Sequence, residues 1–448
     1  MIPRILLGFC LLATSLQAVN EADLTLQLVQ IVWRHGDRNP TDPYPSDPYD
    51  EAFWEKRGGY GELTTRGMAM HVRLGDALKT RYKDFLSQRY NAHEIYIRST
   101  DVNRTIISAM SNLIGMYSQD NSTVPGEDYP DFSNEKYYWP TGFRPIAIHT
   151  VDDNTDYLGN ANAYCPRQDA LWKLAYDNCP EVKALINEPG TQQLIETLRQ
   201  AVNITYKVDD LWMIHDVLFI ENVNKLEMPK WWSQQLMDNL TKINNRLEDM
   251  QDGIGLSPFN GIDFSVELPK LRVGALTNDM RMHMNLKLAC QGQTTRNCTW
   301  MNRLKYFAYS AHDETIASFL ATMGIKDDVV PDGYPLYSSA AMVELYQDKT
   351  GKPYFRLMYH QGDQLEPPFE TITKYVKGCG GGDFCDVDVF RKQADLYNPG
   401  DAAKLCQDLS FLQGSTAQPP QPTTTKTSSG FSFGILTLLA FLHAQLLR

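Results

Sequence analysis

An apolar strand that ends in a cluster of charged residues constrains this chain more than any other feature. Residues 24–33, LTLQLVQIVW, first alternate between apolar and polar side chains and then become fully apolar, which is typical of a buried β-strand. Gly36 and Pro40 end the strand, so His35 lies at its carboxyl end beside charged side chains. Ligands of open α/β sheets bind at that edge. The sequence therefore predicts a functional site where this strand ends.

The residue types in this segment suit the transfer of a phosphoryl group. A neutral imidazole can attack phosphorus and carry the phosphoryl group, and guanidinium groups donate forked hydrogen bonds to phosphate oxygens. His35, flanked by Arg34 and Arg38, combines both functions. The alternative is an ordinary strand end with solvated arginines and an incidental histidine, and the choice depends on what distant residues supply.

Two further segments end in the same way. Residues 94–98, EIYIR, alternate as a strand and place Arg98 at its carboxyl end, and residues 305–324 predict a strand that ends near His312 and Asp313 before a helix. Each residue considered alone has an ordinary interpretation: Arg98 would be a surface arginine, and Asp313 would be the N-cap of a helix. A parallel sheet would bring the three strand ends to one edge, joining a nucleophile, guanidinium groups, a second histidine and a carboxyl group. Hydrolysis of a phosphate monoester through a phosphohistidine requires such a set.

The rest of the chain predicts an α/β fold with a smaller helical cap domain. We expect a mainly parallel sheet flanked by helices, with further strands at 144–151, 341–346 and 354–359 and helices at 65–86 and 271–289. Residues 152–252 are mainly helical in pattern, with segments at 167–177, 191–202, 211–222 and 231–250. They form a cap insertion between the two parts of the catalytic domain, 19–151 and 253–410.

Charge and the two chain ends indicate the compartment. The formal net charge of -12 argues against nucleic acid as a partner and requires any anion site to be a local positive pocket. Residues 1–18 have the pattern of a secretory signal peptide. At the other end we expect a disordered Pro/Thr/Ser-rich stalk over 411–430 and an apolar anchor or anchor signal over 431–448, either a transmembrane helix or a glycolipid signal. The protein is thus expected in the secretory pathway, attached to a membrane on the extracellular or lumenal side.

Cysteines and sequons fit an oxidising compartment. Of eight cysteines, Cys10 leaves with the signal peptide, so the odd number that remains leaves at least one thiol over. Cys290 with Cys298, and Cys379 with Cys385, are near enough in sequence to close small loops. No pair has CxxC spacing, so no structural metal is expected. Sequons, expected to be glycosylated except for Asn103 beside the site, occur at Asn103, Asn121, Asn203, Asn239 and Asn297.

Four motifs together resemble those of a known enzyme family. RHGDRNP from Arg34, GELTTRG from Gly61, IYIRSTDVNRT from Ile95 and SAHDETI from Ser310 resemble the histidine acid phosphatases of the animal prostatic and lysosomal type. The resemblance covers roughly residues 24–406 and implies small phosphate monoester substrates, no metal or other cofactor, and often a homodimer. Carried over to this sequence, it implies His35 as the nucleophile, Asp313 as the proton donor, and phosphate ligands at Arg34, Arg38, Arg98 and His312.

The resemblance also implies disulfides Cys165–Cys406 and Cys379–Cys385. One family disulfide is expected to be absent, because Ile220 and Ala340 stand where its cysteines would fall. Cys290 and Cys298 offer a local replacement, and Cys179 is then unpaired.

A protonated Asp313 and a neutral His35, which nearby guanidinium groups favour, predict an acidic, bell-shaped pH optimum. Two alternatives stay open. One is a related enzyme acting on inositol phosphates. The other is a non-catalytic membrane glycoprotein that keeps the fold, against which the intact His35, Arg98 and Asp313 count.

Overall fold

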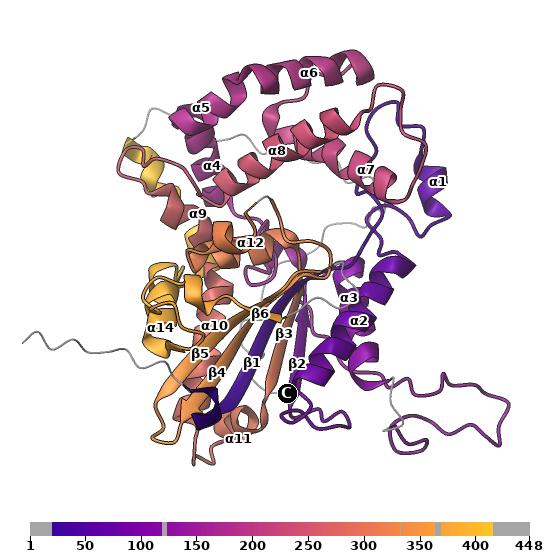
Figure 1. Ribbon diagram of the computed structural model, residues 1–448, viewed down its shortest axis with the longest axis vertical. Helices are drawn as coiled ribbons and strands as arrows, with labels where there is room; N and C mark the ends of the chain where they lie inside the picture. The colour runs from indigo at the N-terminus through magenta and orange to yellow at the C-terminus, as the bar shows by residue number, and fades with distance from the viewer. Residues whose placement is uncertain (1–19, 119–122, 332, 363–368, 415–448) are drawn as a thin grey trace, which may run out of the picture.

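A mixed sheet with helices on both faces forms the centre of the molecule (Figure 1). The computed structural model describes residues 20–118, 123–331, 333–362 and 369–414. The strand order is β2-β3-β1-β4-β5-β6, and β7 pairs with β5. The strands are β1 (Leu24–Arg34), β2 (Ile95–Ser99), β3 (Tyr306–Ala311), β4 (Ala340–Asp348), β5 (Pro353–His360), β6 (Phe369–Thr371) and β7 (Cys385–Asp386).

The α/β fold class is confirmed, but the sheet is parallel only in its β2-β3-β1 half. The strands β4 to β7 pair antiparallel with their neighbours, so the expected mainly parallel sheet is corrected to a mixed one. The link from β4 to β5 is only residues 349–352, which is too short for the crossover that a parallel pair needs. The three strands that end at the predicted site all belong to the parallel half.

The apolar run of β1 is buried because helices cover the sheet on both sides. Val29, Ile31 and Trp33 pack toward α2 (Thr65–Arg81) and α3 (Asn103–Tyr117). Leu28 and Val32 belong to the core on the opposite face, which α10 (Gly274–Ala289), α12 (Asp313–Thr322) and α14 (Val387–Leu396) cover. An alternating strand would have left one face in water. The continuous apolar pattern therefore fixes β1 at the centre of the sheet.

Most predicted helices are present, with shifted ends. The outer helices are α1 (Glu51–Glu55), α9 (Phe264–Arg272), α11 (Arg296–Arg303), α13 (Lys326–Val329) and α15 (Ala402–Cys406). The helix expected over 271–289 is two helices, because the backbone leaves helical geometry at Val273 between α9 and α10.

The strand expected at 144–151 is wrong: only His149 pairs with Arg98, as an isolated bridge. His149 donates its N–H to the carbonyl oxygen of Ile97 at 3.0 Å and accepts from the N–H of Ser99 at 2.9 Å.

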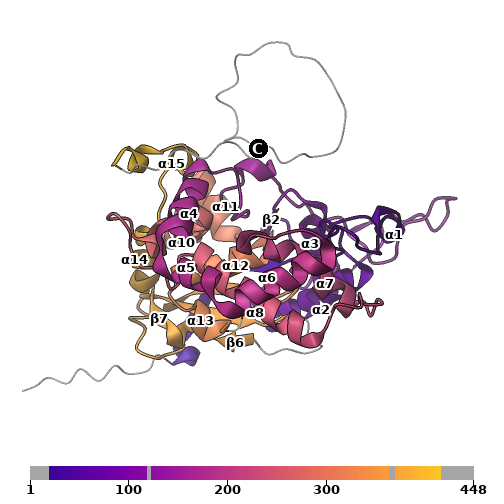
Figure 2. The same cartoon turned by 90° about the horizontal axis from the view of Figure 1, so that it is seen from above.

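The cap helices lie above the edge of the sheet where the parallel strands end (Figures 1 and 2). They are α4 (Pro166–Asn178), α5 (Pro180–Asn187), α6 (Pro189–Val202), α7 (Leu211–Val223) and α8 (Gln234–Gln251). Prolines stand at the start of α4, α5 and α6, where the missing N–H is not needed. The cap has an apolar core of its own, with Leu171, Leu198, Ile214 and Leu240 fully buried.

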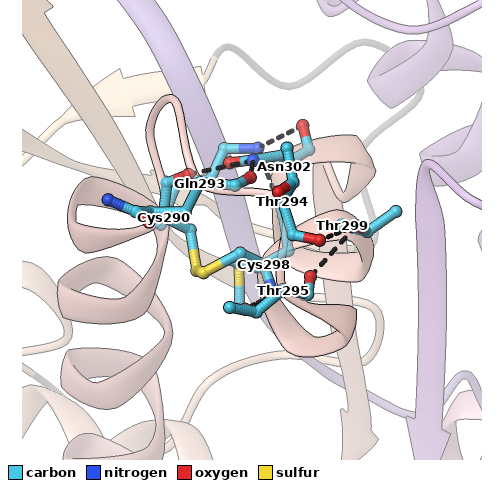
Figure 3. The surroundings of a disulfide bond; sticks show 9 residues. Cys290, Gln293, Thr294, Thr295, Cys298, Thr299 and Asn302 are labelled. Carbon is cyan, nitrogen blue, oxygen red and sulfur yellow. Dashed lines mark hydrogen bonds between the residues drawn. A yellow bond between two sulfur atoms is a disulfide. The ribbon is translucent and has the colours of Figure 1, made fainter.

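Three disulfides are present, and each joins a pair that the sequence predicted. They are Cys165–Cys406, Cys379–Cys385 and Cys290–Cys298, while Cys179 is buried and free. Figure 3 shows the Cys290–Cys298 loop, in which the amide of Asn302 donates to the carbonyl oxygens of Cys290 and Gln293 at 2.9 and 3.1 Å. This loop ties α10 to α11.

The predicted signal peptide and anchor, and the stalk beyond Gly414, lie outside the described residues. Within the described ranges, no helix is both long and apolar enough to cross a membrane. Asn103, Asn203, Asn239 and Asn297 are exposed, and Asn121 lies outside the described ranges.

Candidate active site

A cavity of about 540 Å³ lies where β1 and β3 end beneath the cap. Adjacent parallel strands place their carboxyl ends side by side, and Arg34 pairs in register with Ala311. The rings of His35 and His312, which follow those two residues, are therefore 5.6 Å apart between centroids. The cavity is lined by side chains from β1, α3, α7, α8 and α12, including Arg34, Arg38, Arg104, Asp216, Glu248, Asp313 and Glu314.

His35 is buried in the form that a nucleophile needs. Its Nδ1 lies 2.8 Å from the carbonyl oxygen of Gly36, which can only accept a hydrogen bond. Nδ1 therefore carries the proton, and the lone pair is on Nε2. Burial, followed by the positive charges of Arg104 and Arg34, holds the pKa of His35 well below its ordinary value. The imidazole is neutral even in acid solution.

Two glycines hold the His35 segment against α2. A Cβ on Gly36 would lie 2.4 Å from the carbonyl oxygen of Gly67, and one on Gly67 would lie 2.2 Å from that of Asp37. Only glycines allow so close an approach of two backbones. Thr64 begins α2 by accepting from the Gly67 N–H, and its hydroxyl donates to Asp37 at 2.6 Å. The GELTTRG segment thus supports the loop that carries His35.

Arg34 and Arg38 each hold a carboxylate that lines the cavity. Arg34 pairs with Asp313 at 2.7 Å and lies 4.3 Å from the centre of the Tyr337 ring. Arg38 forms a forked pair with Asp216 of the cap, at 2.8 and 3.0 Å. Burial opposes the ionisation of Asp313, but the charge of Arg34, hydrogen bonding with Glu314 and the charge of Arg38 together outweigh burial and hold the pKa of this carboxyl below its ordinary value.

Arg98 is not brought into the cavity, contrary to the sequence prediction. Its guanidinium pairs with the fully buried Asp156 at 2.6 Å, and Asp156 also accepts from the backbone of Gly159. The carbonyl of Gly159 accepts in turn from the Thr315 hydroxyl of α12 at 2.8 Å. Arg98 therefore supports the segment beneath α12. The strand places it beside Tyr96 on the outer side of β2, away from the buried Ile97 and Ser99.

Arg104, which the sequence prediction missed, takes the place in the cavity that Arg98 was expected to fill. It is the second residue of α3, and its Nε is buried without a hydrogen-bond partner. Within the described part of the chain it has no carboxylate in ion-pair contact. Burial and the nearby Arg38 lower its pKa. A cation in the first turn of a helix opposes the helix dipole, a signal that could have identified it.

His312 lies between the strand end and α12. Its Nε2 is 3.1 Å from the hydroxyl of Thr100, which itself donates to Thr105 at 2.9 Å, so the Nε2–H donates to Thr100. Burial, with Arg104 second, lowers the pKa of His312 to about 3. The structure thus brings together five of the six predicted site residues and replaces the sixth.

The chain matches the family model described as histidine phosphatase superfamily (branch 2) over residues 25–360. Similar proteins include putative acid phosphatase 10 of Caenorhabditis elegans, 32% identical with 87% of this chain and 96% of that protein covered. Prostatic acid phosphatase of Rattus norvegicus is 29% identical, with 91% and 96% covered. Lysosomal acid phosphatase of Xenopus laevis is 28% identical, with 94% and 86% covered.

Solved structures with the same fold include the apo form of the Hafnia alvei phytase, with a TM-score of 0.59 and 14% identity. The match covers 87% of this chain and 100% of that one. A complex of the Bifidobacterium longum multiple inositol polyphosphate phosphatase with inositol hexasulfate matches with a TM-score of 0.51 and 13% identity, covering 87% and 96%. At these identities the likeness shows the fold alone.

Proposed function

The chain belongs to branch 2 of the histidine phosphatase superfamily and is an acid phosphatase, and we propose that it cleaves phosphate monoesters through a phosphohistidine on His35. In the first step Nε2 of His35 attacks phosphorus, the bond from phosphorus to the ester oxygen breaks, and Asp313 protonates the leaving oxygen. In the second step water attacks the phosphohistidine, Asp313 takes the water proton, and phosphate leaves.

The observation that carries this proposal is a cluster of cations with one member lacking a carboxylate partner. Within the described residues Arg104 lies near His35 and Arg38 without a carboxylate in ion-pair contact, and its Nε, like those of Arg34 and Arg38, is buried without a hydrogen-bond partner. Holding like charges together costs free energy unless an anion binds between them. We therefore assign phosphate binding to Arg34, Arg38 and Arg104. His312, which the sequence also predicts as a phosphate ligand, would have to turn its Nε2–H from Thr100 to a phosphate oxygen.

Substrate binding also explains how Asp313 can act as an acid. The ion pair with Arg34 favours the carboxylate form of Asp313. A bound phosphate competes for Arg34 and brings negative charge close to Asp313, and both changes favour the protonated carboxyl. The pH profile is then set by Asp313 and by the second ionisation of the phosphate ester near about pH 6. An acidic optimum follows.

The wall of the cavity favours esters with one phosphate over inositol polyphosphates. Apart from Arg34, Arg38 and Arg104, the described residues that line it include no lysine or arginine. Trp212, Phe219, Asp238 and Glu248 face the space that a leaving group would occupy. Several phosphates on one ring would lack cations there. We expect p-nitrophenyl phosphate to be cleaved far faster than myo-inositol hexakisphosphate, and equal rates would favour the alternative.

The deciding experiment is to trap the phosphorylated enzyme. Radiolabelled phosphate ester is mixed with the enzyme, the reaction is stopped in alkali, where phosphohistidine survives, and the labelled peptide is sequenced. We expect label on His35, none in His35→Ala, and normal labelling in His93→Ala, a control at an exposed histidine. Full turnover by His35→Ala would refute the mechanism.

We further propose the compartment and organisation expected from the sequence. Similarity to lysosomal and prostatic enzymes, three disulfides and exposed sequons support a secretory location. A signal peptide at 1–18, a cap at 152–252, membrane attachment through 431–448 and a homodimer stay predictions. Glycosidase digestion, detergent phase partition and sedimentation of the full chain test glycosylation, attachment and dimerisation in turn.

A further inference from the structure

We propose that Glu314 holds the catalytic proton in the resting enzyme and delivers it to the leaving group through Asp313. Glu314 follows Asp313 in the first turn of α12, and both side chains line the cavity. Figure 1 shows α12 between the edge of the sheet and the cap helix α8. This inference rests on the proposed roles of His35 and Asp313, and it adds a residue to which those roles give no part.

Contact between the two carboxyl groups requires a proton. The side chains of Glu314 and Asp313 lie close enough for one carboxyl group to donate a hydrogen bond to the other. An ionised carboxylate can only accept, so one of the two groups must be protonated for the bond to exist. Asp313 also pairs with Arg34 at 2.7 Å, which favours its charged form. The proton therefore lies on Glu314.

The surroundings of Glu314 on balance favour its neutral form, although the nearby cation Arg272 opposes it. Burial is the largest cause, and the charges of Asp313 and Glu248 add to it, so the pKa of Glu314 is raised well above its ordinary value. Burial also raises the pKa of Glu248 to about 8. The cation Arg272 is already paired with Asp252 at 2.7 Å. The charged or titratable groups around Glu314 are Asp313 on α12, Glu248 on α8, Arg272 on α9, Arg104 on α3 and Tyr334.

Substrate binding would move this proton by one hydrogen bond. When phosphate takes Arg34 from Asp313, the affinity of Asp313 for a proton rises. The proton then passes from Glu314 to Asp313 and on to the leaving oxygen as its bond to phosphorus breaks. In the second step Asp313 takes a proton from the attacking water and returns it to Glu314. The cycle balances with no other proton source.

The dependence of rate on the leaving group tests the relay. Nitrophenolate leaves without a proton, whereas the alkoxide of glycerol 2-phosphate needs one. For Glu314→Gln we expect kcat/KM for glycerol 2-phosphate to fall about 10- to 100-fold and that for p-nitrophenyl phosphate to fall less than about threefold. The alkaline limb of the glycerol 2-phosphate profile should move to lower pH. Glu314→Asp, which keeps a carboxyl, should recover part of the loss.

Matched controls separate the outcomes. Glu221→Gln makes the same change at a fully buried glutamate of α7 that does not line the cavity, and it should leave the ratio of the two kcat/KM values unchanged. An equal fall for both substrates in Glu314→Gln, with no shift in pH profile, would mean a structural role and overturn the relay. If His35→Ala also kept full activity, the proposed mechanism itself would fail. If His35→Ala were inactive but Glu314→Gln kept the normal ratio of the two kcat/KM values, the relay alone would be refuted.

Discussion

Replacing Arg104 by glutamine should weaken phosphate binding and stabilise the fold. The net contribution of a hydrogen bond to a charged group is about 1.5–3 kcal/mol of binding free energy. Losing the guanidinium should therefore raise the inhibition constant of inorganic phosphate about 10- to 150-fold. However, Arg104 is repelled by the nearby Arg38 and lies in the first turn of α3. Removing that repulsion and the opposed helix dipole should stabilise the protein by about 0.5–1 kcal/mol. If Arg104 had a purely structural role, its replacement would not weaken phosphate binding and at the same time stabilise the fold.

Arg98→Gln is the matched control, and its effects should be reversed. Arg98 is paired with Asp156, which has no exposed surface, while the side chain of Arg98 is 21% exposed. Breaking a buried ion pair by removing one partner costs about 3–5 kcal/mol, and the partial exposure of Arg98 places the cost near the lower end. We expect a melting temperature several degrees lower. The inhibition constant of phosphate, measured below that temperature, should change less than in Arg104→Gln.

Both variants are measured by phosphate inhibition of p-nitrophenyl phosphate hydrolysis at mildly acidic pH and by thermal unfolding without phosphate. Arg104→Lys, which keeps the charge but not the fork, should give an intermediate inhibition constant. The assignment is refuted if Arg104→Gln changes the inhibition constant less than about twofold. It is equally refuted if Arg98→Gln weakens phosphate binding as much as Arg104→Gln does.

Three further predictions concern stability. Burial, with the charge of Asp47 second, raises the pKa of Glu221 to about 9 from 4.5, so the folded state keeps a proton that the unfolded chain releases, and stability falls as pH rises between these values. Urea unfolding at several pH values should show that Glu221→Gln loses this pH dependence of the unfolding free energy, which amounts to up to about 1.4 kcal/mol per pH unit. Parallel plots of unfolding free energy against pH for the two proteins would contradict the prediction. Loop closure predicts that Cys298→Ser, which opens a separation of 8, costs about 2.5 kcal/mol, and that Cys406→Ser, which opens one of 241, costs about 5. Equal losses of unfolding free energy in the two variants would show that loop-closure entropy does not determine how much each disulfide stabilises the fold. Gly36→Ala forces a Cβ against a backbone oxygen at 2.4 Å, so it should cost about 1–3 kcal/mol and lower kcat by displacing His35. Normal melting and turnover would refute that reading.

The sequence was sufficient to place His35, Asp313 and the strands that carry them. A short, mostly apolar run that ends at a glycine and a proline favours a strand covered on both faces, and such strands end at a common edge when they are parallel. The same local reading placed most cap helices and the two short disulfide loops, because periodicity and short cysteine spacing are properties of the chain itself. The long-range pair Cys165–Cys406 was implied only by the family resemblance.

Strand direction and the third arginine depended on contacts between distant segments. Hydrophobic pattern carries no direction, so the antiparallel pairing of β4 with β1 followed only from the folded structure. For β4 and β5 the short link of residues 349–352 already indicates an antiparallel pair. Arg98 and Arg104 lie six positions apart, and both read as arginines near a strand end. Which arginine lines the cavity depends on Asp156, 58 residues further along the chain, which forms an ion pair with Arg98. It also depends on the turn before α3, which places the start of that helix at the cavity.

Local pattern thus determined which chemical groups the chain offers and on which elements they stand, because side-chain periodicity is set by neighbouring residues. Only the tertiary structure decided which guanidinium is left free for a ligand and which carboxyl keeps a proton. Both depend on charges and burial supplied by segments far apart in the sequence.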